Sequence, residues 1–154
     1  MCSGLTKVMV KIFRLLRRKI KKVFREFLVY HNSSLEYRAK VITLVLAINN
    51  EISECEEELL KKMALEIYNN DEERADILVE TVKEYFVKIE TNNGLDFEHL
   101  IFKVEKETKA VKRFSEKIDI EALMKFQVCL ENEEDKIYQQ RVISFLKDLK
   151  ERYE

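Results

Sequence analysis

Residues 35–60 read LEYRAKVITLVLAINNEISECEEELL, an apolar segment, a polar break and an acidic segment in direct succession. The apolar segment, residues 35–48, predicts a helix at the centre of the core, because its own side chains are apolar on nearly every face of such a helix. Asn49 and Asn50 are expected to end this helix, since asparagine tolerates the left-handed backbone conformation found at helix ends. A turn is therefore predicted directly after the central helix.

A capping box marks the start of the next helix. Ser53 is followed three residues later by Glu56, so the serine side chain can bind the glutamate amide while the glutamate reaches back to the serine amide. This helix is expected over residues 54–68. Further segments with helical periodicity follow turns or capping residues, namely 72–90 behind Asp71, 97–114 behind Asp96, 120–131 behind Asp119, and 133–152.

The composition supports a fold made of helices alone. The 154 residues include no Pro and only two Gly, whereas sheet-rich folds need many tight turns built from these residues. We therefore expect an all-α helical bundle of about six to seven helices. An apolar helix, a short turn and an acidic amphipathic helix occur at 38–68 and again at 120–150, which indicates a weak internal duplication.

Charge divides the chain into two parts. Residues 1–25 hold nine of the 28 basic residues and no acid, so the remainder of the chain carries a net charge of about −10. We expect a basic arm over residues 1–33 and an acidic helical domain over residues 34–154. Such asymmetry is typical of a protein whose arm meets an anionic surface.

The arm is predicted to form one amphipathic helix over residues 5–30. Apolar residues recur at alternating spacings of three and four, and the basic residues lie off this stripe. The expected membrane-binding or partner-binding residues are Lys11, Phe13, Arg14, Leu16, Arg18, Ile20, Lys21, Lys22, Phe24, Arg25 and Phe27.

Several binding partners are compatible with such a helix. Its apolar face can enter an anionic membrane surface while the cations meet headgroups. Alternatively, it can dock in a protein groove, pair with a second copy of the chain, or pack on the acidic domain. Nucleic acid is disfavoured as a partner, because the acidic domain would repel it and no recognition motif is present.

Residues 46–56, Leu-Ala-Ile-Asn-Asn-Glu-Ile-Ser-Glu-Cys-Glu, resemble the turn between two helices of the TerB-like family, named for tellurite resistance. The resemblance extends over about 35–152. It implies a compact all-helical domain that is often attached to membrane or partner modules and has no established chemistry of its own. Together with the basic arm and the cysteine pattern, this resemblance leads us to expect a cytoplasmic, non-enzymatic adaptor in envelope or metal-ion stress that is peripheral on the inner face of the membrane.

The family's acidic cluster, proposed to hold a divalent metal, is altered in this chain. The Asp-Gly of the family motif is replaced by Asn49-Asn50, and only Glu56 and, loosely, Glu131 match in chemistry. An asparagine carbonyl is a weaker ligand for a hard cation than a carboxylate. We therefore expect turn and capping roles here, with no metal.

Catalytic and cofactor signatures are absent from the sequence. No phosphate-binding glycine loop, metal-ligand spacing or nucleophile motif occurs, so we expect no catalytic residue, cofactor or small-molecule substrate. Cys2, Cys55 and Cys129 are widely separated and odd in number, which predicts free thiols in a reducing compartment, with Cys55 and Cys129 packed as small apolar residues. No apolar segment approaches the ~20 residues that a membrane-spanning helix needs.

Overall fold

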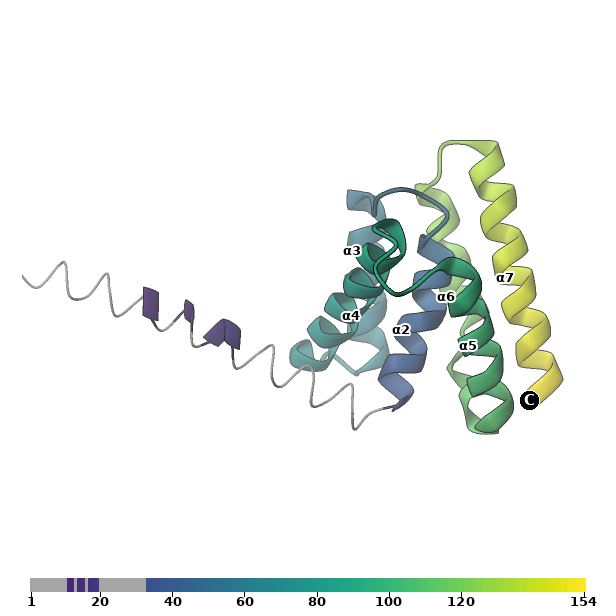
Figure 1. Cartoon of the computed structure of the whole chain (residues 1–154), viewed down its shortest axis with the longest axis horizontal. Coiled ribbons are helices and arrows are strands. Elements are labelled where there is room, and N and C mark those ends of the chain that lie inside the picture. Colours follow the sequence, from purple (N-terminus) through teal and green to yellow (C-terminus); the bar gives the residue numbers. More distant parts are fainter. Residues whose placement is uncertain (1–10, 13, 16, 20–32) are drawn as a thin grey trace, which may run out of the picture. The chain divides into compact units, whose positions relative to one another are not determined.

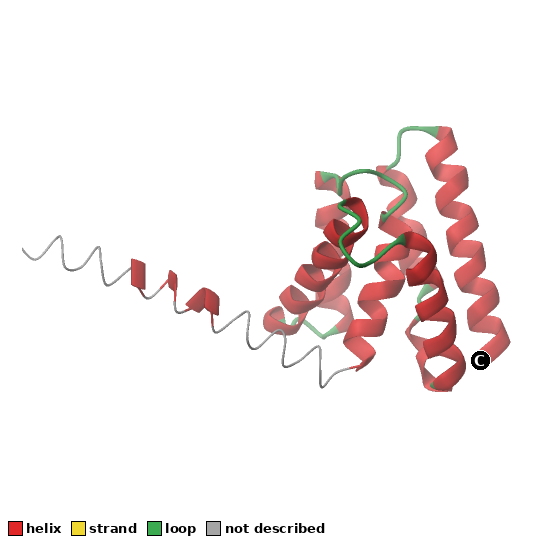
Figure 2. Cartoon of the chain, in the orientation of Figure 1, coloured by secondary structure: helices red, strands yellow, loops and turns green. Residues whose placement is uncertain are grey.

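The computed structural model describes residues 11, 12, 14, 15, 17–19 and 33–154. It divides into two compact units, Met1–Ser33 and Ser34–Glu154. The second unit is an all-α bundle, and no strand occurs among the described residues (Figure 2). Its elements are α2 (Ser33–Leu46), α3 (Glu54–Ile67), α4 (Glu72–Glu90), α5 (Phe97–Ala110), the 3-10 helix η1 (Lys112–Lys117), α6 (Ile120–Met124), the 3-10 helix η2 (Lys125–Cys129) and α7 (Glu133–Tyr153).

Helix α2 forms the centre of this bundle. Ten of its 14 residues are buried, as expected for a helix that is apolar on nearly all sides. In Figure 1 it runs between α3 and α4 on one side and α5 and α7 on the other. The buried hydroxyl of Thr43 is satisfied within the helix, because it donates to the Ala39 carbonyl at 2.6 Å. The prediction that this segment forms the core is confirmed.

Helix starts follow the sequence closely. Both hydrogen bonds of the Ser53–Glu56 capping box are present, each at 3.1 Å. Asp71, Asp96 and Asp119 each accept a hydrogen bond from the backbone three residues later, as predicted. These caps satisfy amide groups that have no partner inside the helix.

The prediction that Asn49 and Asn50 end α2 in the left-handed conformation is wrong. The backbone is left-handed at Asn69, Asn70 and Asn92 but not at Asn49 or Asn50. Helix α2 already ends at Leu46, so the two asparagines lie beyond the helix end rather than at it. The left-handed pair instead closes α3, where the amide of Asn70 donates to the Leu65 carbonyl at 2.8 Å.

Two predicted long helices are interrupted. The segment 97–114 leaves the α conformation at Val111, whose backbone is extended, and continues as η1, which buries Phe114. The segment 120–131 is split into α6 and η2, each of five residues. The second copy of the proposed duplication therefore begins with two short pieces where the first copy has one long helix.

The acidic helical domain, residues 34–154, is called the body below. The prediction that its two cysteines are free thiols is also wrong. Cys55, the second residue of α3, and Cys129, the last residue of η2, form a disulfide with their Cα atoms 5.6 Å apart. The two residues are 74 positions apart, so only the tertiary fold brings them together. Cys55 is exposed and Cys129 is half-buried, so neither is a core residue.

Candidate functional site

The described part of the basic arm carries exposed cations. Of the predicted binding residues, Lys11, Arg14 and Arg18 are described, and all three are helical and exposed. The apolar residues Ile12 and Leu15 between them are 51% and 59% exposed. The other predicted residues, Phe13, Leu16, Ile20, Lys21, Lys22, Phe24, Arg25 and Phe27, lie outside the described residues.

The chemistry of this arm is that of an anion-binding surface. Arg17 and Lys19 are helical and exposed as well, and residues 1–25 contain no carboxylate that could pair with them. Guanidinium and ammonium groups that have no acid along their own segment remain available to an anionic surface. The exposed apolar side chains beside them can enter a less polar phase at the same time.

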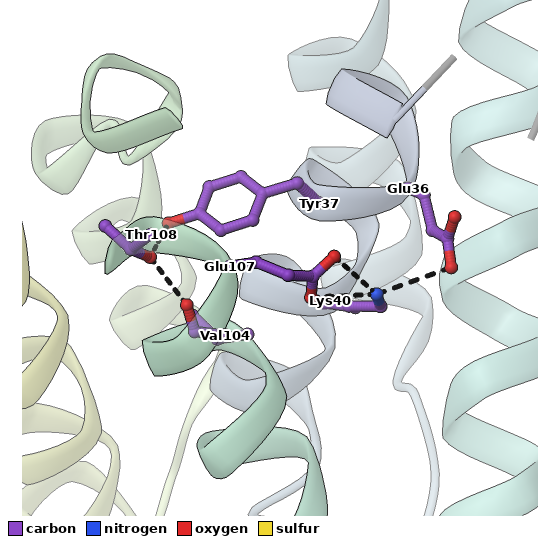
Figure 3. Close-up of polar contacts among 6 residues, drawn as sticks. All are labelled: Glu36, Tyr37, Lys40, Val104, Glu107 and Thr108. Atoms are coloured by element: carbon purple, nitrogen blue, oxygen red, sulfur yellow. Dashed lines mark hydrogen bonds and ion pairs between the residues drawn. The ribbon is translucent and has the colours of Figure 1, made fainter. Parts of the chain in front are cut away.

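A buried ionic cluster joins α2 to α5 (Figure 3). Lys40 is only 7% exposed, and its ammonium donates to both carboxylate oxygens of Glu107 at 2.9 Å. The same nitrogen lies 3.3 Å from Glu36 Oε1, one turn earlier on α2. Because two carboxylates engage the ammonium, we assign Lys40 a structural role as a cross-link between the two helices.

Two tyrosines extend this cluster. The Tyr37 hydroxyl lies 2.6 Å from Thr108 Oγ1, and Thr108 in turn donates to the Val104 carbonyl, which makes Tyr37 the donor in the first bond. Burial raises the pKa of Tyr37 to about 12, and the nearby Glu107 charge adds to the effect. Burial and the carboxylate of Glu36 likewise raise the pKa of Tyr85. These phenols stay protonated and serve as donors.

No local sequence pattern predicted this cluster as a unit. A lysine in the middle of an apolar helix was the available signal, since a charged residue on a buried helix needs a partner.

Glu56 carries the second buried charge of the body. It is 1% exposed, and one carboxylate oxygen, Oε2, has no hydrogen-bond partner. Burial raises the pKa of Glu56, while the amide and hydroxyl of Ser53 and the side chain of Asn49 partly offset the rise. Asn49 and Glu56 thus lie close together, and among the described residues no group of three or more His, Cys, Asp or Glu side chains is placed to hold a metal ion.

A small hollow opens between α2, α3 and α6. Its volume is about 170 Å³, and its walls are mainly apolar, with Val41, Met63 and Leu123 among them. Arg38, Glu66, Lys117 and Asp119 stand around it. The hollow accommodates one large side chain at most.

Several apolar and aromatic residues of α6, η2 and α7 are exposed to solvent. Val128 is 80% exposed, and Met124, Ile137 and Tyr138 are about half exposed. Tyr138 of α7 lies against Phe97 of α5, with ring centroids 6.5 Å apart. The short helices α6 and η2 thus leave Met124 and Val128 facing solvent.

Comparison with models of protein families, with curated proteins and with solved structures finds no match to this chain. Within the described residues, no helix is both long enough and apolar enough to cross a membrane.

Proposed function

We propose that the protein is a non-enzymatic helical adaptor that binds an anionic membrane surface through its basic arm. The observation that carries this proposal is the grouping of nine cations without an acid in residues 1–25, of which Lys11, Arg14, Arg17, Arg18 and Lys19 are described as helical and exposed.

The energetics favour binding of the arm to anionic lipid. Each Lys or Arg near such a surface contributes about 1 kcal/mol, and the exposed Ile12 and Leu15 add apolar area that can enter the headgroup boundary. The net charge of the body is negative, so the body is repelled by the same surface. The arm would hold the protein at the membrane while the body remains available to a partner protein.

The polar groups of the body support a non-enzymatic role. Tyr37 bonds to Thr108, Lys40 bonds to Glu107, and Glu56 caps a helix. A general acid or base must reach a substrate from a cleft. The groups with shifted pKa values lie instead in helix–helix contacts and in a helix cap.

Co-sedimentation with vesicles tests the membrane proposal. The full chain is expected to bind phosphatidylserine–phosphatidylcholine vesicles but not pure phosphatidylcholine vesicles. Replacing two exposed arginines, Arg14→Glu with Arg18→Glu, should weaken binding by roughly 30-fold or more, because two contacts of about 1 kcal/mol each are lost and repulsion replaces them.

A charge-matched variant provides the control. Lys62→Glu with Lys147→Glu changes the net charge equally, at exposed positions of α3 and α7, and should bind vesicles like the unmodified chain. Equal binding by the arm variant and the unmodified chain would contradict the proposal. If the unmodified chain binds neither vesicle, the arm is instead a protein-docking helix, and light scattering would show whether a second copy is its partner.

A further inference from the structure

The Cys55–Cys129 disulfide lies at the surface of the body. It joins the first turn of α3 to the last residue of η2, where Cys55 is exposed and Cys129 is half-buried. A thiolate from solution reaches an exposed disulfide more readily than a buried one. The bond is therefore placed where exchange with an external thiol is sterically open.

The segment that this bond holds is built from short pieces. Helices α6 and η2 have five residues each, so each contributes few internal hydrogen bonds. Leu123 and Phe126 are its buried anchors, whereas Met124 and Val128 face solvent. A segment with short helices and few buried residues opens at lower cost than the rest of a domain.

The packing between this segment and α3 is incomplete. The hollow of about 170 Å³ lies where this segment meets α2 and α3, with Met63 and Ile67 of α3 on one wall and Ala122 and Leu123 of α6 on another. Side chains that line a hollow lose contacts that a filled interface would provide. The covalent bond thus supplements a noncovalent contact between this segment and α3 that the hollow interrupts at α6.

We propose that Cys55–Cys129 is a site of reversible thiol–disulfide exchange with dithiol reductants, and that its reduction releases α6–η2 from α3 while the rest of the body stays folded. One thiolate of the dithiol attacks a sulfur of the bond, forms a mixed disulfide and expels the other cysteine as a thiolate. The second thiol of the reagent then displaces the first cysteine and leaves as a cyclic disulfide. Two electrons pass from the reagent to the protein, and a small-molecule disulfide such as oxidised glutathione reverses the change.

Release of the segment has a defined consequence. The walls of the hollow separate, so apolar side chains that face each other across it become accessible. The buried core around α2 has other attachments, because Tyr37 bonds to Thr108 and Lys40 to Glu107 of α5, and Gln139 of α7 donates to the Val45 carbonyl. The redox state of one bond would therefore control the exposure of one apolar surface.

Amide hydrogen exchange of the folded full chain tests this proposal. After reduction with dithiothreitol, amides of residues 120–130 should exchange at least ~10-fold faster, while those of α2 and α5 keep their protection. Treatment with oxidised glutathione should restore the original rates. Alkylation and mass measurement should show two additional free thiols in the reduced sample without denaturant.

Cysteine variants separate this mechanism from general effects of the reductant. Cys55→Ser and Cys129→Ser should exchange rapidly at residues 120–130 under all conditions, whereas Cys2→Ser should respond to reductant like the unmodified chain. Three outcomes would overturn the proposal. They are a bond that resists dithiothreitol until the protein is denatured, unchanged protection at residues 120–130 after full reduction, and loss of protection throughout the body, which would make the bond a simple staple.

Discussion

The arm and the body use the same charged residue types in opposite ways. In the body, several cations pair with acids, as Lys40 does with Glu36 and Glu107 and as Lys83 does with Glu57 at 2.8 Å. In residues 1–25 no acid exists, and the described cations are exposed. In the body, paired charges therefore stabilise contacts within and between helices, whereas the cations of the arm are available to bind another molecule. The net charge of −1 for the whole chain hides this division.

Truncation of apolar side chains should give the largest difference in stability effect between the arm and the body. Leu44 of α2 is fully buried, so Leu44→Ala should lower the free energy of unfolding of the body by about 2–5 kcal/mol through lost burial and a residual cavity. Leu15 of the arm is exposed, so Leu15→Ala should leave the urea unfolding midpoint unchanged. Equal losses in the two variants would mean that the arm is part of the same cooperative core.

The buried ion pair provides the next largest contrast. Lys40→Met keeps the aliphatic stem but leaves Glu107 without its cation, which should cost about 1 kcal/mol, near the lower end for unpaired buried groups because the carboxylates are about a third exposed. The matched arm variant Lys11→Met should have no effect on unfolding. Urea titrations of both variants measure this difference.

A double variant sharpens the same experiment. Lys40→Met combined with Glu107→Gln removes the unpaired charge and should recover part of the lost stability. Strict additivity of the two single changes would show that Lys40 and Glu107 do not act as a pair.

Contacts between residues close in the sequence were predictable, whereas contacts between distant residues were not. The caps at Ser53, Asp71 and Asp119 were predictable because each bond joins residues three positions apart. In contrast, Lys40 and Glu107 are 67 positions apart, and the two cysteines are 74 positions apart. No local pattern in a single sequence carries such pairings.

Helix interruptions were missed for a different reason. Apolar spacing continues from Leu100 to Phe114, so the pattern predicted one helix. The chain leaves the α conformation at Val111 and still buries Phe114, whose ring stacks on Tyr37 with centroids 4.7 Å apart. A 3-10 turn and an α-helix place apolar residues at similar spacings, so periodicity does not distinguish them.

Two neighbouring glutamates of α3 offer the finest test of how the body uses its charges. Burial raises the pKa of Glu56, so the folded protein retains a proton that the unfolded chain releases near pH 4.5. Stability then falls as pH rises from that value through the folded pKa. Hydrogen bonds from Lys83 and Lys61 instead lower the pKa of Glu57. Its contribution is present above the unfolded pKa and is lost as pH falls through the folded pKa.

Glutamine variants should therefore change the pH dependence of stability in opposite directions. Relative to the unmodified chain, Glu56→Gln should gain stability between about pH 4 and pH 7, because glutamine keeps the capping bond and has no charge to bury. Glu57→Gln should lose stability over the same range, by a small amount because solvent screens an exposed pair. Urea midpoints at several pH values measure both slopes. Slopes of the same sign would mean that net charge, rather than the surroundings of each carboxylate, governs the stability of the body.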